Sequence, residues 1–510
     1  MPLLTFLVAL SIFPIILPTL AQDGSVDGPS TSTEAAGYSC DPSKCQLPTC
    51  RCASTDIPGG IPHDQTPQFI VFTADDAIQS YTINAVNNLL AHRKNPNGCT
   101  PKMTYFTQIS YTNFTLVTDW FVAGNEIADH TMTHPELGGP DEINGNLVTL
   151  NALAGIPLKD IRGFRAPYLN YSSEMLGNLV KAGFTYDSSA TASIPVNQNG
   201  TDAFWPYTLD NGLANDCLTI PGICKGQPKL PGFWEVLMYA IFDERGGVGT
   251  HLMDPWIDGN NSAVYKWMQN TFVAHYNANR QPFGLYTHPI HIATGYPGVA
   301  DPTDTINMIN SFLDWAQQQS NVWIVSTGQL LDWVMNPVPA SQLNSIQSFQ
   351  CALPVVEAKI CNGIPSNEAG LLSHCAFTDF PFYTCYGCPA TQPSPSDPNP
   401  SQPAVSGKTR TRLPSDCYTA FWDPINGTCL CQNGTSCQFT DQTRPIGPNG
   451  ANLTGGGTGG GPTSSPSYVP FNGGSGGALS NVHLGANVLL SVGLGLVGVA
   501  FGVLSTMLAA

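Results

Sequence analysis

Short apolar runs alternate with longer amphipathic segments between residues 66 and 340. The run QFIVF at 68–72, for example, precedes IQSYTINAVNNLLAH at 78–92, where apolar residues recur with helical spacing. The further expected strands are 103–108, 125–130, 161–167, 283–288 and 322–327, and the further expected helices are 115–124, 142–155, 172–183, 304–319 and 328–335. This alternation predicts an α/β fold with a parallel sheet or a closed barrel. Reactive residues should then gather at the carboxyl ends of the strands.

The stretch 188–250 interrupts this alternation. It is rich in glycine and proline and contains Cys217 and Cys224. We expect a long insertion that is closed by its own disulfide and shapes one wall of a cleft.

All 16 cysteines follow residue 21, and an even number predicts disulfides in an oxidising compartment. The spacing C-x4-C-x4-C-x-C from Cys40 to Cys52 lacks the C-x2-C pairs of zinc ribbons, so we expect a disulfide-pinned segment at 40–65 rather than a zinc site. Cys99 should pair with one of the five cysteines of 351–388.

Both ends of the chain predict a secretory route. Residues 1–21 have the apolar core and small terminal residues of a signal peptide. Residues 479–510 end in an uncharged apolar run, which is typical of a GPI-anchor signal and leaves a transmembrane helix as the alternative. Seven Asn-x-Ser/Thr sequons fit this route, at Asn113, Asn170, Asn199, Asn260, Asn426, Asn433 and Asn452.

The remaining segments differ in composition. We expect a barrel domain at 66–340, a cysteine-rich tail packed on it at 341–388, a Pro/Ser linker at 389–416, a small cysteine cluster at 417–440 and a Gly/Ser/Thr stalk at 441–478. The cluster is either a disulfide knot or a carbohydrate-binding module with exposed Tyr418, Phe421 and Trp422. With 19 Lys and Arg against 36 Asp and Glu, the chain is too acidic to bind nucleic acid.

Two adjacent carboxylates, Asp75 and Asp76, follow the first expected strand. Adjacent like charges repel, so a buried pair would need a cation or a strong donor nearby. The alternative is a strand that ends in a solvated turn. His130 and His134 have the i, i+4 spacing of zinc-binding histidines, but Thr131 replaces the Glu of H-E-x-x-H. A divalent cation held by Asp76, His130 and His134 would relieve the repulsion and leave Asp75 as general base. The alternative is two solvated histidines.

Two later motifs complete this set. Arg165 in RAPY would hold Asp75 ionised, and the backbone N–H of Tyr168 could donate to an oxyanion. Asp187 in YDSS is a plausible partner of Arg165. In GLYTHPIH, both His288 and His291 could protonate a leaving amine, and we prefer His288 because it ends an expected strand.

Together, the motifs TADD, HTMTH, RAPY, YDSS and YTH resemble those of the polysaccharide deacetylases of carbohydrate esterase family four over residues 40–390. Within that family the chain looks most like chitin deacetylases of the arthropod type, which the NPNGC loop and the WPYTL segment also indicate. It departs from the family pattern at Ala74, where Phe is usual, at Tyr286, where Leu is usual, and in a fourth motif without tryptophan.

The resemblance implies a distorted (β/α)7 barrel and metal-dependent removal of acetyl groups from N-acetylglucosamine units. It implies Asp75 as base, Asp76, His130 and His134 as metal ligands, Arg165 and Asp187 as an orienting pair, Tyr168 as oxyanion donor and His288 as acid. The ligand set suits Zn²⁺, with Co²⁺ as an alternative. We expect a secreted, GPI-anchored chitin deacetylase at the cell wall. The alternatives are a non-catalytic chitin-binding wall protein and a deacetylase of another polysaccharide.

Overall fold

The computed structural model describes residues 37–217, 220, 222–351 and 372–402 and the backbone of 422–423 and 428–429. The expected signal peptide, stalk and anchor signal lie outside these residues, as do most of the cysteine cluster and the second half of the linker. None of the helices in the described part of the chain is both long and apolar enough to span a membrane.

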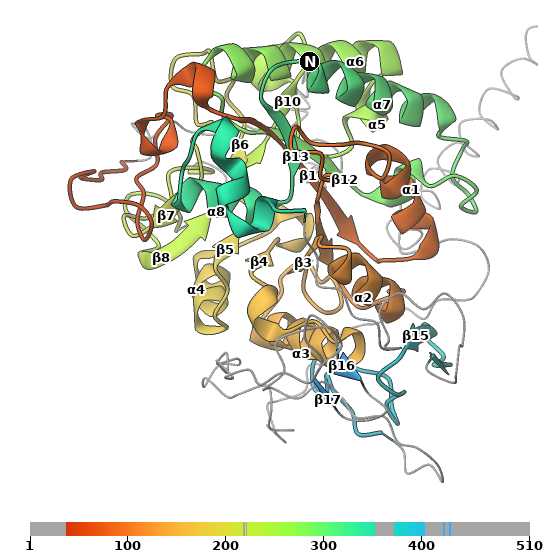
Figure 1. Cartoon of the computed structure of the whole chain (residues 1–510). Coiled ribbons are helices and arrows are strands. Elements are labelled where there is room, and N and C mark those ends of the chain that lie inside the picture. Colours follow the sequence, from red (N-terminus) through yellow and green to blue (C-terminus); the bar gives the residue numbers. More distant parts are fainter. Residues whose placement is uncertain are drawn as a thin grey trace, which may run out of the picture.

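A curved parallel sheet forms the centre of the molecule (Figure 1). Seven parallel strands follow one another in the order β12 (Phe283–Thr287), β1 (Gln68–Asp76), β2 (Thr104–Thr107), β3 (Glu126–Asp129), β4 (Gly163–Phe164), β5 (Tyr186–Asp187) and β8 (Leu230–Glu235). β13 (Val322–Val325) pairs in parallel with the first half of β1, and β7 (Tyr207–Leu209) is an antiparallel edge strand beside β8. The predicted distorted (β/α)7 barrel is confirmed.

Helices surround this sheet (Figure 1). They are α1 (Ser80–Leu90), α2 (Phe114–Val122), α3 (Pro140–Ala154), α4 (Ser173–Lys181), α5 (Pro255–Asp258), α6 (Asn261–Asn277), α7 (Thr303–Gln317) and α8 (Thr327–Met335). Single 3₁₀ turns include η4 (Pro167–Leu169) and η6 (Pro289–Ile292), which follow strands β4 and β12. Short strand pairs lie outside the main sheet: β6 (Thr191–Ala192) with β9 (Met238–Tyr239), β10 (Ile241–Phe242) with β11 (Thr250–His251), β14 (Ser373–Cys375) with β15 (Phe382–Thr384), and β16 (Trp422–Asp423) with β17 (Thr428–Cys429).

Both faces of β1 are buried, which explains why its sequence is almost continuously apolar. Ile70 and Phe72 pack in the layer that also contains helix residues such as Val86. Phe69 and Val71 point the other way, into a second layer with Trp333. Because side chains alternate along a strand, consecutive residues at the end of β1 also face different surroundings.

The barrel is open between β8 and β12. Among the described residues no ladder joins these strands; an isolated parallel bridge pairs Met253 with Tyr286 of β12. The Tyr286 hydroxyl accepts a hydrogen bond from the Tyr239 backbone N–H at 3.0 Å. Tyr286, one of the departures from the family pattern, therefore links the two sides of the opening.

The stretch 188–250 is more than an insertion. It contains β8, a member of the main sheet, which the sequence did not indicate because Pro231 and Gly232 interrupt its apolar pattern. The expected Cys217–Cys224 disulfide is present.

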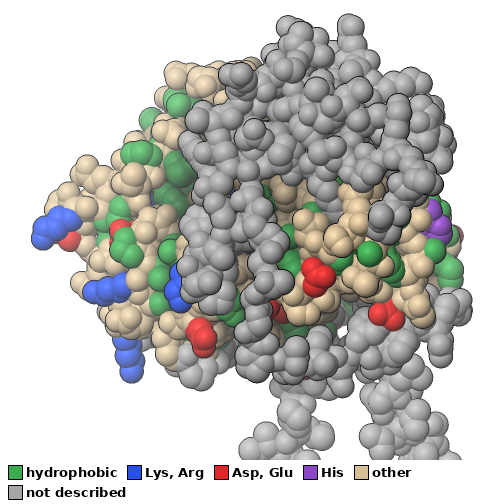
Figure 2. Space-filling model, turned by 90° about the horizontal axis from the view of Figure 1, so that it is seen from below, with side chains coloured by type: hydrophobic (Ala, Val, Ile, Leu, Met, Phe, Trp, Pro, Cys, Tyr) green, Lys and Arg blue, Asp and Glu red, His purple; other side chains and the backbone are tan. Residues whose placement is uncertain are grey.

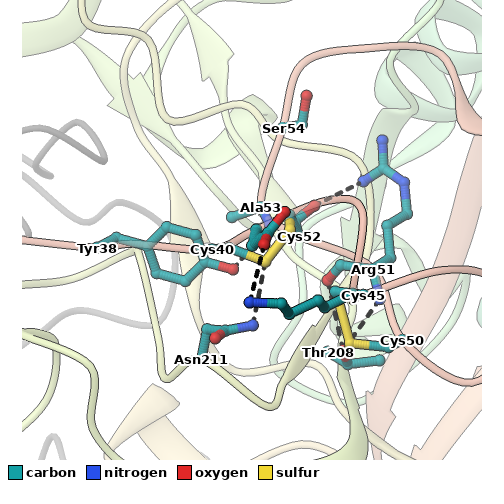
Figure 3. Close-up of a disulfide and its surroundings, with 12 residues drawn as sticks. Tyr38, Cys40, Cys45, Cys50, Arg51, Cys52, Ala53, Ser54, Thr208 and Asn211 are labelled. Carbon is teal, nitrogen blue, oxygen red and sulfur yellow. Dashed lines mark hydrogen bonds and ion pairs between the residues drawn. A yellow bond between two sulfur atoms is a disulfide. The ribbon is translucent and has the colours of Figure 1, made fainter.

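Two disulfides close the N-terminal segment on itself, and the buried Arg51 attaches it to the barrel. Cys40 pairs with Cys52, and Cys45 pairs with Cys50 (Figure 3). The backbone of Arg51 makes two hydrogen bonds to Thr208 of β7. Arg51 N–H donates to Thr208 Oγ1 at 3.1 Å, and Thr208 N–H donates to Arg51 O at 3.0 Å. The predicted disulfides of this segment are therefore present.

The tail is attached to α2 and α3. Cys99 pairs with Cys351 and Cys375 with Cys388, and the Phe382 ring of β15 meets the Phe114 ring of α2 at 5.0 Å. Pro398, in the first part of the expected linker, accepts a hydrogen bond from Thr149 of α3 at 2.8 Å. On the face shown in Figure 2, few charged side chains are visible, and the Lys and Arg side chains lie toward the left of the view, in keeping with a charged content of 11%.

Removing the Cys99–Cys351 disulfide should lower the free energy of unfolding by about 2–5 kcal/mol, because a bridge across a long segment restricts the unfolded chain strongly. Its sequence separation is 252 residues, against 7 for Cys217–Cys224. Urea unfolding of the two double Cys→Ala variants should therefore show the larger loss for the first pair. Equal losses would contradict this explanation.

Candidate active site

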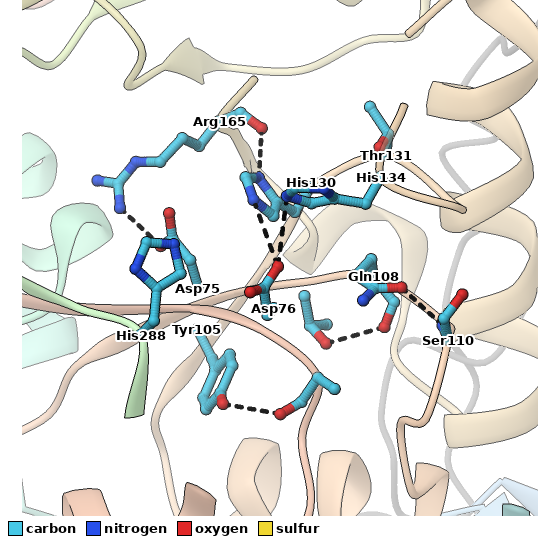
Figure 4. Close-up of polar contacts among 12 residues, drawn as sticks. Asp75, Asp76, Tyr105, Gln108, Ser110, His130, Thr131, His134, Arg165 and His288 are labelled. Atoms are coloured by element: carbon cyan, nitrogen blue, oxygen red, sulfur yellow. Dashed lines mark hydrogen bonds and ion pairs between the residues drawn. The ribbon is translucent and has the colours of Figure 1, made fainter. Parts of the chain in front are cut away.

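The two carboxylates at the end of β1 diverge (Figure 4). Asp75 is 2% exposed and points toward Arg165, whereas Asp76 points toward His130 and His134. Asp76 has a left-handed backbone with φ of 81°, a conformation that costs a non-glycine residue about 1–3 kcal/mol. The strand end thus separates two neighbouring acids into two different environments.

Asp75 is held by a wholly buried arginine. Nη1 of Arg165 lies 2.7 Å from Oδ1 of Asp75 and also donates to Thr73 Oγ1 at 2.8 Å. The guanidinium packs over the Phe106 ring at 4.1 Å, and its Nε donates to Ser188 O at 3.0 Å. Burial raises the pKa of Asp75 to about 6, although the positive charge of Arg165 opposes this rise. A fixed, ionised carboxylate of this kind can accept a proton.

Asp76, His130 and His134 form a cluster that could hold a metal ion. One ligand atom from each lies within 4.8 Å of the others. Oδ1 of Asp76 is 3.4 Å from Nε2 of His134 and 4.0 Å from Nε2 of His130. Burial by itself would raise the pKa of Asp76, but the imidazoles of His134, His288 and His130 lower it below its usual value.

The donor chemistry of this cluster fits a divalent cation. Nδ1 of His130 lies 2.7 Å from the carbonyl oxygen of Arg165, so it carries the proton and leaves Nε2 as a lone-pair donor facing Asp76. Burial lowers the pKa of His130 to about 3, which keeps the ring neutral. Two imidazoles and one carboxylate are a typical catalytic zinc set.

The loop that carries the two histidines is strained and supported by α3. Thr131 and His134 have φ values of 61° and 59°. Glu142, in the first turn of α3, accepts hydrogen bonds from Met132 N–H at 3.1 Å, Thr133 N–H at 2.8 Å and Thr133 Oγ1 at 2.7 Å. Glu142 was not predicted from the sequence, where it reads only as an acidic residue at the start of a helix.

His288 follows β12 and is paired with Asp254, a residue that the sequence did not suggest. Nδ1 of His288 lies 2.6 Å from Oδ2 of the fully buried Asp254, which also accepts from His288 N–H and Thr287 Oγ1. Burial by itself would lower the pKa of His288, but Asp254 raises it to about 10. In the sequence, Asp254 is a single acid before Pro255 in an irregular stretch, and only its proximity in the fold reveals its partner.

Asp187 does not meet Arg165 as the proposed orienting pair would require. No ion pair joins them among the described residues. The Asp187 carboxylate instead accepts from the N–H and hydroxyl of Ser189, each at 2.9 Å. Ser189 Oγ in turn accepts from the N–H of Ala166 at 2.8 Å, so Ser189 links Asp187 to the Arg165 segment, and the charge of Arg165 acts to lower the pKa of Asp187.

Asp187 also faces a second buried acid. It pairs in register with Glu235 of β8, and both side chains are fully buried. Burial raises the pKa of Asp187 to about 7, and burial together with Asp187 raises the pKa of Glu235 well above its usual value. The pair is therefore not fully ionised at neutral pH.

Tyr168 and His291 lie next to the central groups. The Tyr168 ring packs edge-on against His134, with centroids 4.7 Å apart, and its φ of 56° turns the backbone at the end of RAPY. His291 lies in η6, with its ring centroid 6.0 Å from that of His288. Ala74 is buried in the layer beneath the helices, on the face of β1 opposite to Asp75.

The two carboxylates of β1 and His288 line one pocket. Asp75, Asp76 and His288 line it together with uncharged residues, which are Ala77, Gln79, Thr82, Gln108, Tyr111, Pro289, Ile290 and Tyr296. The carboxylates and His288 thus share one cavity, into which a neutral polar molecule could fit.

The chain is similar in sequence to two proteins of Bombyx mori. It is 28% identical to chitin deacetylase 8 over 380 residues, covering 70% of this chain and 92% of that protein. It is 27% identical to chitin deacetylase 1 over 388 residues, covering 70% of this chain and 68% of that protein. No family model matches the chain.

Among solved structures, the chitin deacetylase of the fungal pathogen Colletotrichum lindemuthianum is 13% identical, with 53% of this chain and 90% of that chain covered. The TM-score of 0.28 is too low for any conclusion to rest on this likeness.

Replacing Asp254 with Asn should remove a pH-dependent part of the stability. The folded pKa of His288, about 10, lies above the ordinary value of about 6.5, so the ion pair stabilises the fold fully below about pH 6.5 and less as the pH rises toward 10. Urea unfolding should show a gap between the wild type and Asp254→Asn that is largest near neutral pH and shrinks in alkali. A gap that stays constant with pH would refute this ion pair.

Proposed function

We propose that this chain is a polysaccharide deacetylase of carbohydrate esterase family four and that it hydrolyses the N-acetyl groups of N-acetylglucosamine units in chitin. The products are acetate and chitosan. One observation carries the proposal: one pocket is lined by Asp75, which Arg165 holds, by Asp76 of the candidate metal cluster, and by His288, which Asp254 holds. The names of the two silkworm relatives support chitin as the substrate.

Asp76, His130 and His134 would hold the metal, which we propose to be Zn²⁺, with Co²⁺ as an alternative. When bound in such a site, the ion supplies Lewis-acid polarisation of a carbonyl and lowers the pKa of water. Glu142 keeps the histidine loop in place for this role.

The protein's own groups then divide the proton transfers between them. Asp75 takes a proton from the water that adds to the acetamide carbonyl carbon, and Arg165 keeps this carboxylate oriented. The backbone N–H of Tyr168 would donate to the developing oxyanion. His288, kept protonated by Asp254, gives its proton to the nitrogen as the C–N bond breaks, and acetate leaves.

We further propose that the protein is secreted and GPI-anchored at the cell surface or cell wall. Five disulfides among the described residues support an oxidising, extracellular location. The anchor itself is an inference from sequence, because residues 479–510 lie outside the described residues.

The full secreted chain should release acetate from chitin oligomers, because the pocket holds a base, an acid and the donor set for a metal. EDTA should stop this release by removing the cation, and added Zn²⁺ should restore it. Acetate is measured by an enzyme-coupled assay, and total metal is measured in the same samples. Release that continues after complete metal removal would contradict the proposed role of the cluster.

Asp75→Asn should lower kcat by about 10²- to 10⁴-fold, because the amide cannot accept the proton from water. It should still bind one Zn²⁺ per chain, since Asp75 is outside the proposed ligand set. The matched variant Asp76→Asn should instead lose metal affinity. Near wild-type turnover of Asp75→Asn with metal bound would disprove the assignment of the base.

A further inference from the structure

Two fully buried acids end neighbouring strands of the sheet. Asp187 is the last residue of β5, Glu235 is the last residue of β8, and the two are paired in register. Neighbouring parallel strands lie roughly 5 Å apart, and residues in register point to the same face of the sheet. The two carboxyl groups therefore meet, within hydrogen-bonding reach of each other.

The surroundings of this acid pair favour a single negative charge. Oε1 of Glu235 accepts a hydrogen bond from the Ala190 N–H at 3.2 Å, whereas its buried Oε2 has no donor among the described residues. Two ionised carboxylates here would repel each other and leave Oε2 unsatisfied. One proton held between Oε2 and the Asp187 carboxylate removes both costs. The titratable and charged groups that face the pair are Arg165, Asp216, Tyr171, Tyr207 and Tyr239.

The acid pair holds the loop that follows β5. The N–H and the hydroxyl of Ser189 both donate to Asp187 at 2.9 Å, and the N–H of Ala190 donates to Glu235. The N–H of the preceding residue, Ser188, donates to a carbonyl oxygen of β4 at 2.8 Å. All three backbone N–H groups of residues 188–190 are therefore bound, two of them by the acid pair.

The same loop holds Arg165. The Ser188 carbonyl oxygen accepts a hydrogen bond from Nε of Arg165 at 3.0 Å, and the Ser188 hydroxyl oxygen accepts one from Nη2 at 3.3 Å. Ser189 Oγ accepts from the N–H of Ala166, the residue after Arg165. Nη1 of Arg165 lies 2.7 Å from Asp75. A continuous series of contacts thus runs from the acid pair through residues 188–190 to the catalytic carboxylate.

We propose that Glu235 shares one proton with Asp187 and is a positioning residue for the catalytic base. The singly charged pair keeps residues 188–190 in the position in which they orient Arg165. When alkali removes the shared proton, the two buried anions repel each other, the loop shifts and Arg165 no longer orients Asp75. This inference rests on the proposed function for its kinetic readout, but the shared proton has a spectroscopic readout of its own.

The kinetic experiment compares Glu235→Gln with Glu235→Ala in the full, metal-loaded chain. Glutamine offers a permanent N–H donor to Asp187 and an oxygen to the Ala190 N–H, so Glu235→Gln should keep kcat on chitin oligomers within about 3-fold of the wild type near neutral pH. Alanine offers neither group. Glu235→Ala should therefore lower kcat roughly 10- to 100-fold, with a smaller change in KM, because a displaced loop misplaces Arg165.

The pH profile of kcat separates positioning from a merely structural role. Because glutamine has no proton to lose, the ratio of alkaline to neutral kcat should be roughly 3- to 10-fold higher in Glu235→Gln than in the wild type. His288 titrates in both proteins, so its contribution cancels in this comparison. Equal ratios in the two proteins would refute the inference.

Glu126→Gln is the matched control for replacing an acid of the sheet. Glu126 begins β3, at the opposite end of the sheet, and accepts hydrogen bonds from the Tyr186 hydroxyl at 2.9 Å and the Gly328 N–H at 2.7 Å. Glu126→Gln leaves the acid pair intact, so its ratio of alkaline to neutral kcat should equal that of the wild type. A ratio raised as much as in Glu235→Gln would contradict the proposed role of the pair.

Infrared spectroscopy tests the shared proton without turnover. A protonated carboxyl has a C=O stretching band apart from those of ionised carboxylates, and at neutral pH the band of this pair should be present in the wild type and Glu126→Gln but missing from Glu235→Gln. If the wild type releases no acetate and Glu235→Gln still loses the band, the shared proton stands and the proposed activity fails. If Glu235→Gln loses no band, the inference is refuted.

Thermal unfolding at neutral pH controls for misfolding of the variant. Glu235 must take up a proton when the chain folds at neutral pH, which costs free energy that glutamine does not require. Glu235→Gln should therefore unfold at a temperature no lower than that of the wild type. A clearly lower temperature would contradict a shared proton at this position.

Discussion

The buried ion pair between Asp75 and Arg165 is the interaction on which the site depends. Two adjacent acids end β1, and each has its own set of partners. The alternation of side chains along a strand sends Asp75 toward the fully buried Arg165, while the left-handed backbone at Asp76 directs the second acid toward the two histidines. Removing one partner of such a buried pair typically costs 3–5 kcal/mol, because an uncompensated charge remains.

The rest of the site repeats this arrangement of a functional group and a buried support. His288 has Asp254, the histidine loop has Glu142, and Arg165 has Thr73 and Ser188. Several of these residues have positive φ values, namely Asp76, Thr131, His134, Tyr168 and Asp254. The surrounding hydrogen bonds compensate the free-energy cost of this strained backbone. The strained conformations in turn fix the directions of the side chains.

The sequence predicted much of this architecture, because the signals were local. Apolar periodicity located the strands and helices of the barrel, and short motifs located Asp75, Asp76, His130, His134, Arg165 and His288 close to one another. The cysteine spacing predicted the disulfides at both ends of the barrel. The structure also gives Tyr286 a role, since its hydroxyl accepts a hydrogen bond from Tyr239 of β9 across the opening between β8 and β12.

What the sequence could not show depends on contacts between distant segments. Asp254 stands alone in an irregular stretch, and its partner His288 is 34 residues away. Asp187 was assigned to Arg165 because both lie in adjacent motifs, yet its carboxylate binds Ser189 and faces Glu235. β8 was not recognised because proline and glycine interrupt its pattern, although the parallel sheet includes it.

The most direct test of the central claim is a crystal structure of the full chain soaked with Zn²⁺, with anomalous scattering measured at the zinc edge. The claim predicts one peak bound by Asp76, His130 and His134, with Asp75 still in contact with Arg165 and not coordinating the ion. A peak that is bridged by both Asp75 and Asp76, or no peak at these three residues, would contradict the division of roles between the two carboxylates.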